Sequence, residues 1–175
     1  TWNMGKKISV DSATLINKIF EILEAKKIFN LNLKDIDILL HPSSYIHAIV
    51  EFKNGTSKIL AHETDMKIPI FNSIFFNQKK EYKTKPINIK KLNSLNLHIA
   101  DKKKFTSLNL IKNFNNIEDS FYETVLVSAN DELVNLFLQN KISFLDITRK
   151  LRMIMNLKEF KKMKERKPKN YQQIS

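Results

Sequence analysis

Four polar residues, Ser12, Asn17, Lys18 and Glu21, have the types and spacing to bind a small phosphorylated ligand. Residues 11–29 carry apolar side chains at helical spacing after an Asp-Ser pair that suits a cap, which predicts one continuous helix. Ser12 would then lie at its amino terminus, where free backbone N–H groups and the helix dipole favour phosphate. The other three would share one face, because Glu21 follows Asn17 by four residues and Lys18 by three.

On such a helix, Ser12 and Glu21 would lie near opposite ends of a bound sugar phosphate. At about 1.5 Å per residue, Ser12 and Glu21 are roughly 13 Å apart along the axis, a span that side-chain reach narrows. The Glu21 carboxylate suits a hard divalent cation, Mg²⁺ or Mn²⁺, and Lys18 adds positive charge. The alternative is structural, with Lys18 and Glu21 as an ordinary helical ion pair, Asn17 solvated and Ser12 a cap.

Motifs on both sides of this segment follow one another in a characteristic order. They are Trp2-Asn3-Met4-Gly5-Lys6-Lys7-Ile8, Asp11-Ser12-Ala13-Thr14, Asn17-Lys18 with Glu21, His41-Pro42, Asn54-Gly55, Asp65-Met66 and Pro69-Ile70. In these motifs the chain resembles the 1-deoxy-D-xylulose 5-phosphate reductoisomerase family. Beyond them the resemblance thins to Ser128-Ala129-Asn130 with Asp131, near the family's Asn-Ala-Ala-Asn-Glu.

The resemblance implies an oxidoreductase and isomerase of non-mevalonate isoprenoid biosynthesis. It would convert 1-deoxy-D-xylulose 5-phosphate to 2-C-methyl-D-erythritol 4-phosphate with NADPH and a divalent metal, Mg²⁺ or Mn²⁺. Glu21 and Lys18 would be catalytic, with Glu21 as metal ligand and substrate contact, and Ser12, Asn17 and Lys18 would hold the substrate, chiefly its phosphate. Gly5 would face NADPH. Trp2 and Met4 would belong to a mobile lid over the substrate, although a surface tryptophan is the alternative for Trp2.

Several neighbouring residues have two interpretations. Ile19 stands where many family members have glycine, and helical geometry predicts that it packs inward. His41 and His47 match family positions near the site, but a structural role at a strand end is as plausible for His41. Met66 either contacts the nicotinamide or is a buried methionine at a helix entrance.

The elements that must position these residues predict an α+β fold. The expected strands are residues 36–40, 45–52, 56–61 and an edge strand at 95–99, and the expected helices beyond residue 29 are 70–76, 105–114, 120–138 and 143–160. Asn54-Gly55 predicts a hairpin. The interpretation is a catalytic domain at 1–76 that binds substrate and metal, a connector at 77–104 and an incomplete carboxy-terminal helical bundle at 105–175.

The family's amino-terminal Rossmann domain is not in this sequence, so we expect a fragment that is inactive and holds metal negligibly by itself. Hard cations draw on several oxygen ligands at once, and this chain offers only Glu21 for the family's metal site. The intact protein is expected to be a homodimer, with the strands flanking Asn54-Gly55 at the interface. A catalytically dead remnant of the family is an alternative.

The amino-acid composition excludes several functional classes of protein. The two glycines, Gly5 and Gly55, exclude a glycine-rich nucleotide loop within the chain, and the lack of cysteine excludes disulfides and thiolate chemistry. A net charge of +12 leaves a basic nucleic-acid-binding module as an alternative, but all but three of the 30 basic residues are lysine rather than arginine. We therefore expect neither nucleic acid nor membrane as partner, and a cytoplasmic location.

Overall fold

The segment predicted to be one helix forms two, α1 (Lys6–Ala13) and α2 (Ile16–Ile28), in the computed structural model, which describes residues 5–115, 117, 119–170 and 173. Between them, Leu15 has a left-handed backbone with φ of 58°, which is unfavourable for a branched residue. The Thr14 hydroxyl donates to the carbonyls of Val10 and Asp11, a local bond that bends helices. The prediction of a continuous helix is therefore wrong.

The start of the predicted helix is also wrong. The first helix begins after Gly5, so residues 6–10, which precede the predicted start at residue 11, are also helical. Ser12 consequently lies in the last turn of α1, whereas a capping or anion-binding serine belongs at a helix amino terminus. The residue before α2 is Leu15, which offers no side-chain cap.

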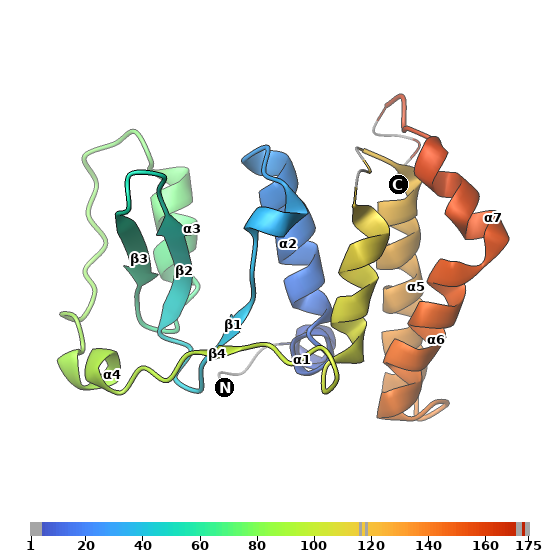
Figure 1. Cartoon of the computed structure of the whole chain (residues 1–175). Coiled ribbons are helices and arrows are strands. Elements are labelled where there is room, and N and C mark those ends of the chain that lie inside the picture. The colour runs from blue at the N-terminus through green and yellow to red at the C-terminus, as the bar shows by residue number, and fades with distance from the viewer. Residues whose placement is uncertain (1–4, 116, 118, 171–172, 174–175) are drawn as a thin grey trace. The chain divides into compact units, whose positions relative to one another are not determined.

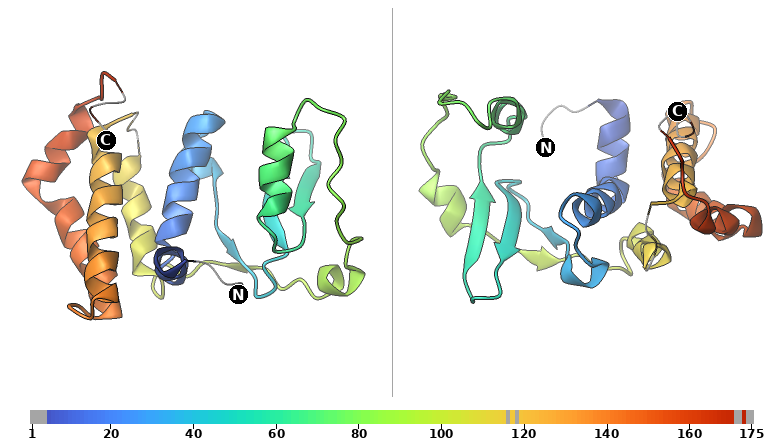
Figure 2. Two further views of the ribbon diagram at one scale, coloured as in Figure 1. Left: turned by 180° about the vertical axis from the view of Figure 1, so that it is seen from behind. Right: turned by 90° about the horizontal axis from the view of Figure 1, so that it is seen from above.

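These two helices belong to a helical unit formed by the described residues within Met4–Ile38 and Ala100–Ser175. Its other elements are the 3₁₀ helices η1 (Leu33–Asp35), η2 (Thr106–Phe114) and η3 (Lys162–Glu165), with α5 (Phe121–Leu138), α6 (Phe144–Asn156) and α7 (Lys158–Lys161). The antiparallel helices α5 and α6 lie side by side, as Figures 1 and 2 show. In addition, α1 packs on α5 and α2 packs on η2. The core between these elements includes Ile16, Ile19, Leu108, Phe114, Tyr122, Leu126, Ile147, Leu151 and Met155.

The three later predicted helices are found with changes at their ends. Residues 105–114 form the 3₁₀ helix η2 rather than an α-helix. The predicted helix 120–138 is confirmed as α5. The predicted helix 143–160 ends at Asn156, because Leu157 is extended with ψ of 139°. Ser143 caps α6 in a capping box with Asp146.

A strand unit, Leu39–Ile99, holds the remaining elements. The expected hairpin pairs β2 (Ile46–Glu51) with β3 (Ser57–Ala61), antiparallel, and Gly55 takes the positive φ of 83° that the turn requires. The predicted strands 36–40 and 95–99 shrink to β1 (Leu39–Leu40) and β4 (His98–Ile99), which pair with each other. Two short helices, α3 (Lys67–Ile74) and α4 (Ile89–Asn93), complete the unit.

The predicted α+β class, helices with antiparallel strands, is confirmed. The predicted boundaries at 76/77 and 104/105 stay a prediction. The described residues within 4–38 group with those within 100–175, because α1 packs on α5 and α2 packs on η2.

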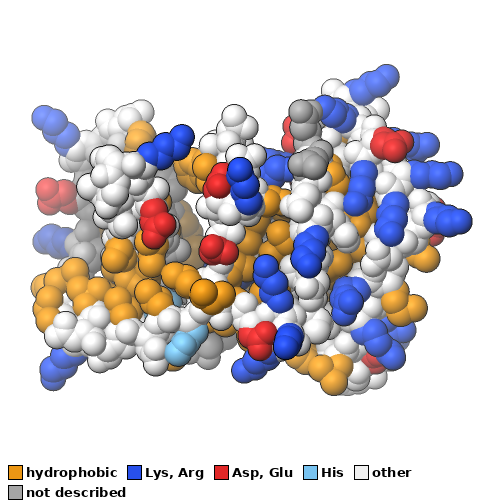
Figure 3. All heavy atoms as spheres, viewed as in Figure 1, with side chains coloured by type: hydrophobic (Ala, Val, Ile, Leu, Met, Phe, Trp, Pro, Cys, Tyr) orange, Lys and Arg blue, Asp and Glu red, His pale blue; other side chains and the backbone are white. Residues whose placement is uncertain are grey.

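The two units differ in surface character. Figure 3 shows Lys and Arg side chains spread over the helical unit and hydrophobic side chains gathered over the strand unit. Val50, Ile59 and Leu60 of the hairpin are about half exposed. Within the described part of the chain, none of the helices has the length and apolar character needed to cross a membrane.

Candidate functional site

Three of the predicted site residues meet on one side of α2. Asn17 Nδ2 donates to Glu21 Oε1 at 2.6 Å, and Lys18 Nζ donates to Glu21 Oε2 at 2.6 Å. We call Asn17, Lys18 and Glu21 the α2 polar face. Both bonded pairs are solvent-exposed, and the Glu21 side chain is 47% exposed. The predicted sharing of one face is confirmed, and the carboxylate is accessible to a ligand.

The opposite side of α2 explains why the polar face is presented outward. Ile16, Ile19 and Leu23 are buried, and Ile19 has no exposed surface. The prediction that Ile19 packs inward is confirmed. A large residue in place of glycine therefore adds to the core and does not crowd the polar face.

Ser12 lies on the other helix. It is half-buried in the last turn of α1, across the left-handed Leu15 from α2. Its place relative to the α2 polar face is thus set by the angle between two helices and not by the rise of one helix. The expected spacing along a single axis does not apply.

Gly5 and the predicted lid residues lie at the beginning of the chain. Gly5 precedes α1, and a side chain added there would meet no described atom within 4 Å. The helical unit itself therefore does not require glycine at this position. Trp2 and Met4 lie outside the described residues.

The described residues provide only part of a site for a hard divalent cation. Among the described residues, no three His, Cys, Asp or Glu side chains cluster as a metal site would require. Glu21 supplies one carboxylate, and both of its oxygens accept hydrogen bonds from neighbours on α2. This chain can thus contribute one ligand to a metal, but a complete site needs further oxygens.

Three histidines of the strand unit make structural contacts. His41 contacts Ser43 Oγ and the Ile46 carbonyl, each at 3.0 Å, and so ties the end of β1 to the start of β2. His47 stacks on His62 with ring centroids 3.6 Å apart. Met66 is 54% exposed at the start of α3, so the interpretation as a buried methionine is wrong and the contact with the nicotinamide stays a prediction.

A buried polar network joins α1 to α5. Asp11, almost fully buried, accepts from Lys7 Nζ at 2.8 Å and from Asn130 Nδ2 at 2.8 Å. The Lys7 ammonium also pairs with Asp131 at 2.9 Å. We call Lys7, Asp11, Asn130 and Asp131 the corner network. Burial lowers the pKa of Lys7, but its hydrogen bonds to the two aspartates outweigh burial and raise the pKa above the ordinary value.

Sequence spacing does not predict this network, although the sequence carries one signal of it. Asn130 interrupts the apolar stripe of α5 between Leu126 and Leu133, and all three residues are buried. A polar residue at a core position predicts a buried partner. The partner itself could not be found from spacing, since Asp11 and Asn130 are 119 residues apart.

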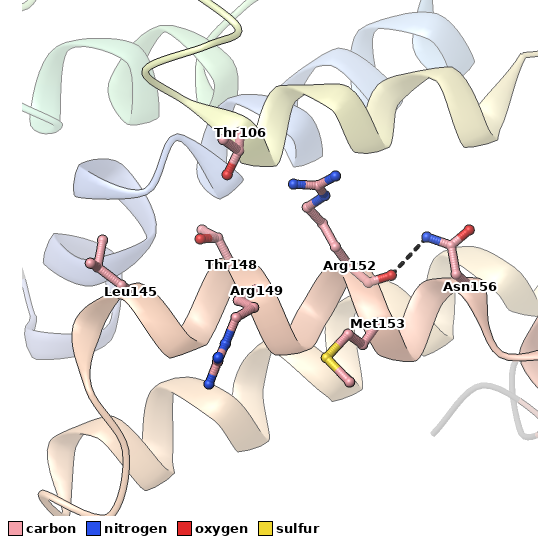
Figure 4. A pocket seen from close by; sticks show the side chains of 7 residues that line it. All are labelled: Thr106, Leu145, Thr148, Arg149, Arg152, Met153 and Asn156. Atoms are coloured by element: carbon pink, nitrogen blue, oxygen red, sulfur yellow. Dashed lines mark hydrogen bonds between the residues drawn. The ribbon is translucent and has the colours of Figure 1, made fainter.

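A shallow hollow of about 480 Å³ lies between η2 and α6. In Figure 4, Arg152 extends toward Thr106 of η2, and Arg149 points away from η2. Arg149 is paired with Asp146 of its own helix. None of the predicted site residues lines this hollow, so the α2 polar face remains the candidate site.

Comparisons with known proteins bear on both halves of the chain. Residues 62–175 match the family model described as DXP reductoisomerase C-terminal domain, and residues 1–29 match that of the 1-deoxy-D-xylulose 5-phosphate reductoisomerase C-terminal domain. A curated relative, the 1-deoxy-D-xylulose 5-phosphate reductoisomerase of Pelagibacter ubique (strain HTCC1062), is 58% identical over 99% of this chain and 44% of its own length. The chain thus spans less than half of that relative.

Solved structures agree. The enzyme of the same name from Zymomonas mobilis in complex with NADPH has a TM-score of 0.82 at 29% identity, over 96% of this chain and 43% of the other. A DOX-P reductoisomerase with fosmidomycin and magnesium has a TM-score of 0.84 at 30% identity, over 93% of this chain and 40% of the other. The arrangement of elements described above is therefore one that solved enzymes of this name share.

Proposed function

The chain belongs to the 1-deoxy-D-xylulose 5-phosphate reductoisomerase family, and we propose that the protein to which it contributes catalyses that reaction. The substrate would be 1-deoxy-D-xylulose 5-phosphate and the product 2-C-methyl-D-erythritol 4-phosphate. The observation that carries the proposal is the α2 polar face, where an amide, an ammonium and an exposed carboxylate converge. This set can bind the oxygens of a sugar phosphate.

Each residue of the face has a role that follows from its chemistry. Lys18 provides a positive charge for the substrate phosphate and Asn17 a neutral donor. Ser12 of α1 adds a hydroxyl from the other side of the Leu15 break. Glu21 is held by exposed hydrogen bonds within its own helix, which contribute little net free energy. Substrate or metal can therefore replace them at small cost.

NADPH and a divalent metal complete the proposal. Solved relatives bind NADPH in one case and magnesium in another. When bound, NADPH supplies the hydride and the cation stabilises negative charge on substrate oxygens. Glu21 would be this chain's ligand to the metal, as one of several oxygens. Gly5 would lie against NADPH, since its position has open space for a neighbour. Trp2 and Met4 keep their proposed role in a lid.

We also propose a cytoplasmic homodimer. Its interface would involve the hairpin of the strand unit, whose two-stranded sheet exposes Val50, Ile59 and Leu60. Two-stranded sheets are marginal by themselves, and exposed apolar residues favour association. Substituting Ile59→Lys should convert the dimer to a monomer in sedimentation velocity. A dimer that persists in the folded variant contradicts this interface.

The activity can be tested with a chimera in which this chain replaces the matching 44% of the Pelagibacter relative. We expect NADPH oxidation that depends on both the deoxyxylulose phosphate and a divalent metal. The chain expressed by itself should show no turnover. A chimera that folds and binds NADPH but has no turnover would favour the catalytically inactive remnant.

No contact among the described residues favours the nucleic-acid alternative over this enzyme. The test is fluorescence anisotropy of the chimera with a labelled DNA duplex at increasing salt. Affinity that stays tight and falls steeply with salt would support the alternative.

A further inference from the structure

We propose that Asn130 and Asp131 of α5 are positioning residues for the substrate site. They act through the corner network, by fixing the angle between α1 and α2. That angle sets the place of Ser12 relative to the α2 polar face. The inference rests on the proposed function of that face, and it concerns residues that do not belong to the face.

The buried carboxylate of Asp11 accepts hydrogen bonds from two helices. A buried charge is tolerated only where donors reach its oxygens, and Asp11 receives one donor from Lys7 and one from Asn130, both at 2.8 Å. Lys7 is on the same helix, so its bond moves with α1. Asn130 is on α5, so its bond fixes where α1 can lie on that helix.

The Asn130 amide is paired through its nitrogen but not, among the described residues, through its oxygen. Asn130 is fully buried, and no described residue donates to its Oδ1. An apolar residue of similar size would avoid a buried, unpaired acceptor, which destabilises the folded state. The amide is therefore poorly suited to simple packing, but it is well suited to orienting Asp11 through its Nδ2.

The corner is the bend at Leu15, between α1 and α2. A left-handed leucine is not favoured locally, so tertiary contacts must hold the corner at Leu15. The Ser107 hydroxyl donates to the Thr14 carbonyl from η2, and Asn130 holds Asp11 one residue before Ser12. In contrast, α2 is anchored by its own buried Ile16 and Ile19. A shift of α1 therefore moves Ser12 but leaves the α2 polar face in place.

Lys7 makes a second bond between α1 and α5, to Asp131. Lys7 bridges Asp11 and Asp131, so α1 contacts α5 at two adjacent residues. Two contacts restrict rotation of α1 about its axis as well as translation. Asp131 is half exposed, so its contribution is expected to be smaller than that of Asn130.

The experiment uses the active chimera and the Asn130→Asp variant, which keeps the shape of the side chain but places two carboxylates together. We expect the KM for the sugar phosphate and the Kd for fosmidomycin to rise about tenfold, with kcat changed less than threefold. The double variant Asp11→Asn with Asn130→Asp restores a carboxylate–amide pair and should return both constants to within threefold. Asn135→Asp is the control, since Asn135 is exposed on the same helix.

A purely structural role of Asn130 predicts a different result. A lower melting temperature with unchanged KM and Kd, or a double variant without recovery, would overturn the proposal. If Asn130→Asp does not fold, Asp131→Ala decides the question, with an expected two- to threefold rise in KM and an unchanged KM contradicting the proposal.

Hydrogen exchange separates this proposal from the proposed function. The amides of residues 12–16 should exchange faster in Asn130→Asp and recover in the double variant, whether or not the chimera turns over. An inactive chimera with this exchange pattern refutes the proposed function and retains the control of the corner by α5. An active chimera whose corner amides do not respond refutes the control by α5.

Discussion

Asp11 and Glu21 accept the same two kinds of donor in opposite surroundings. Each carboxylate is bonded to one asparagine amide and one lysine ammonium. The Asp11 side chain is 3% exposed, and the Glu21 side chain is 47% exposed. The partners of Glu21 are on its own helix, whereas Asn130 reaches Asp11 from another helix.

This difference separates architecture from ligand binding. Water competes with the partners of Glu21, so its bonds contribute little to folding and can be exchanged for a substrate or metal. The partners of Asp11 cannot be exchanged in this way, because removing either donor would leave its buried carboxylate only partly compensated. Identical donor types therefore hold the fold in one place and leave a carboxylate available in the other.

The largest expected effect is on catalysis at the exposed carboxylate. In the chimera, Glu21→Gln should lower kcat about 100-fold or more, because a neutral amide is a poorer ligand for the metal that stabilises transition-state charge. Steady-state kinetics of NADPH oxidation measures this. Glu24→Gln, an exposed glutamate of the same helix, should change kcat less than twofold. An equal loss of kcat in both variants would contradict a metal-binding role and favour a surface ion pair for Glu21.

The next effect concerns stability at the buried carboxylate. Asp11→Ala should lower the free energy of unfolding by about 2 kcal/mol, because it strands Asn130 and removes a partner of Lys7. Glu21→Ala should change it by less than about 0.5 kcal/mol. Urea titration of both variants of the chimera gives the comparison. Similar losses for the two would show that burial does not separate the carboxylates.

A tenfold effect on substrate binding is expected at Lys18. Lys18→Ala should raise the KM for the sugar phosphate about tenfold with kcat nearly unchanged, since a point charge on a non-reacting phosphate contributes equally to ground and transition states. Lys34→Ala, an exposed lysine of η1, is the control. A fall in kcat at constant KM would contradict a phosphate role.

The smallest effect is on the pH dependence of stability. The pKa of Lys7 is raised above 10.5, so its contribution is fully present below that pH and is lost as the pH rises through the folded-state pKa. Thermal melts of the chimera should therefore show a steeper loss of melting temperature above pH 10.5 than melts of Lys7→Met. Parallel curves would exclude Lys7 as a contributor.

Local geometry made part of the site predictable. The α2 polar face follows from spacings of three and four residues, and the β2–β3 hairpin follows from Asn54-Gly55. The positions of α5 and α6 follow from apolar periodicity, and the start of α6 is fixed by the Ser143 cap. Each of these features depends on residues that are close together in the chain, where elementary helix and turn geometry applies.

Contacts between distant residues decided the rest. The sequence alone determined which side chains could bind a phosphorylated ligand, because their types and near-neighbour spacing suffice. Only the tertiary structure decided that the helix breaks at Leu15, that Ser12 belongs to α1, and that Asn130 pairs with Asp11. A left-handed leucine is unfavourable in an isolated chain, and it is retained here because η2 and α5 supply bonds that no local pattern encodes.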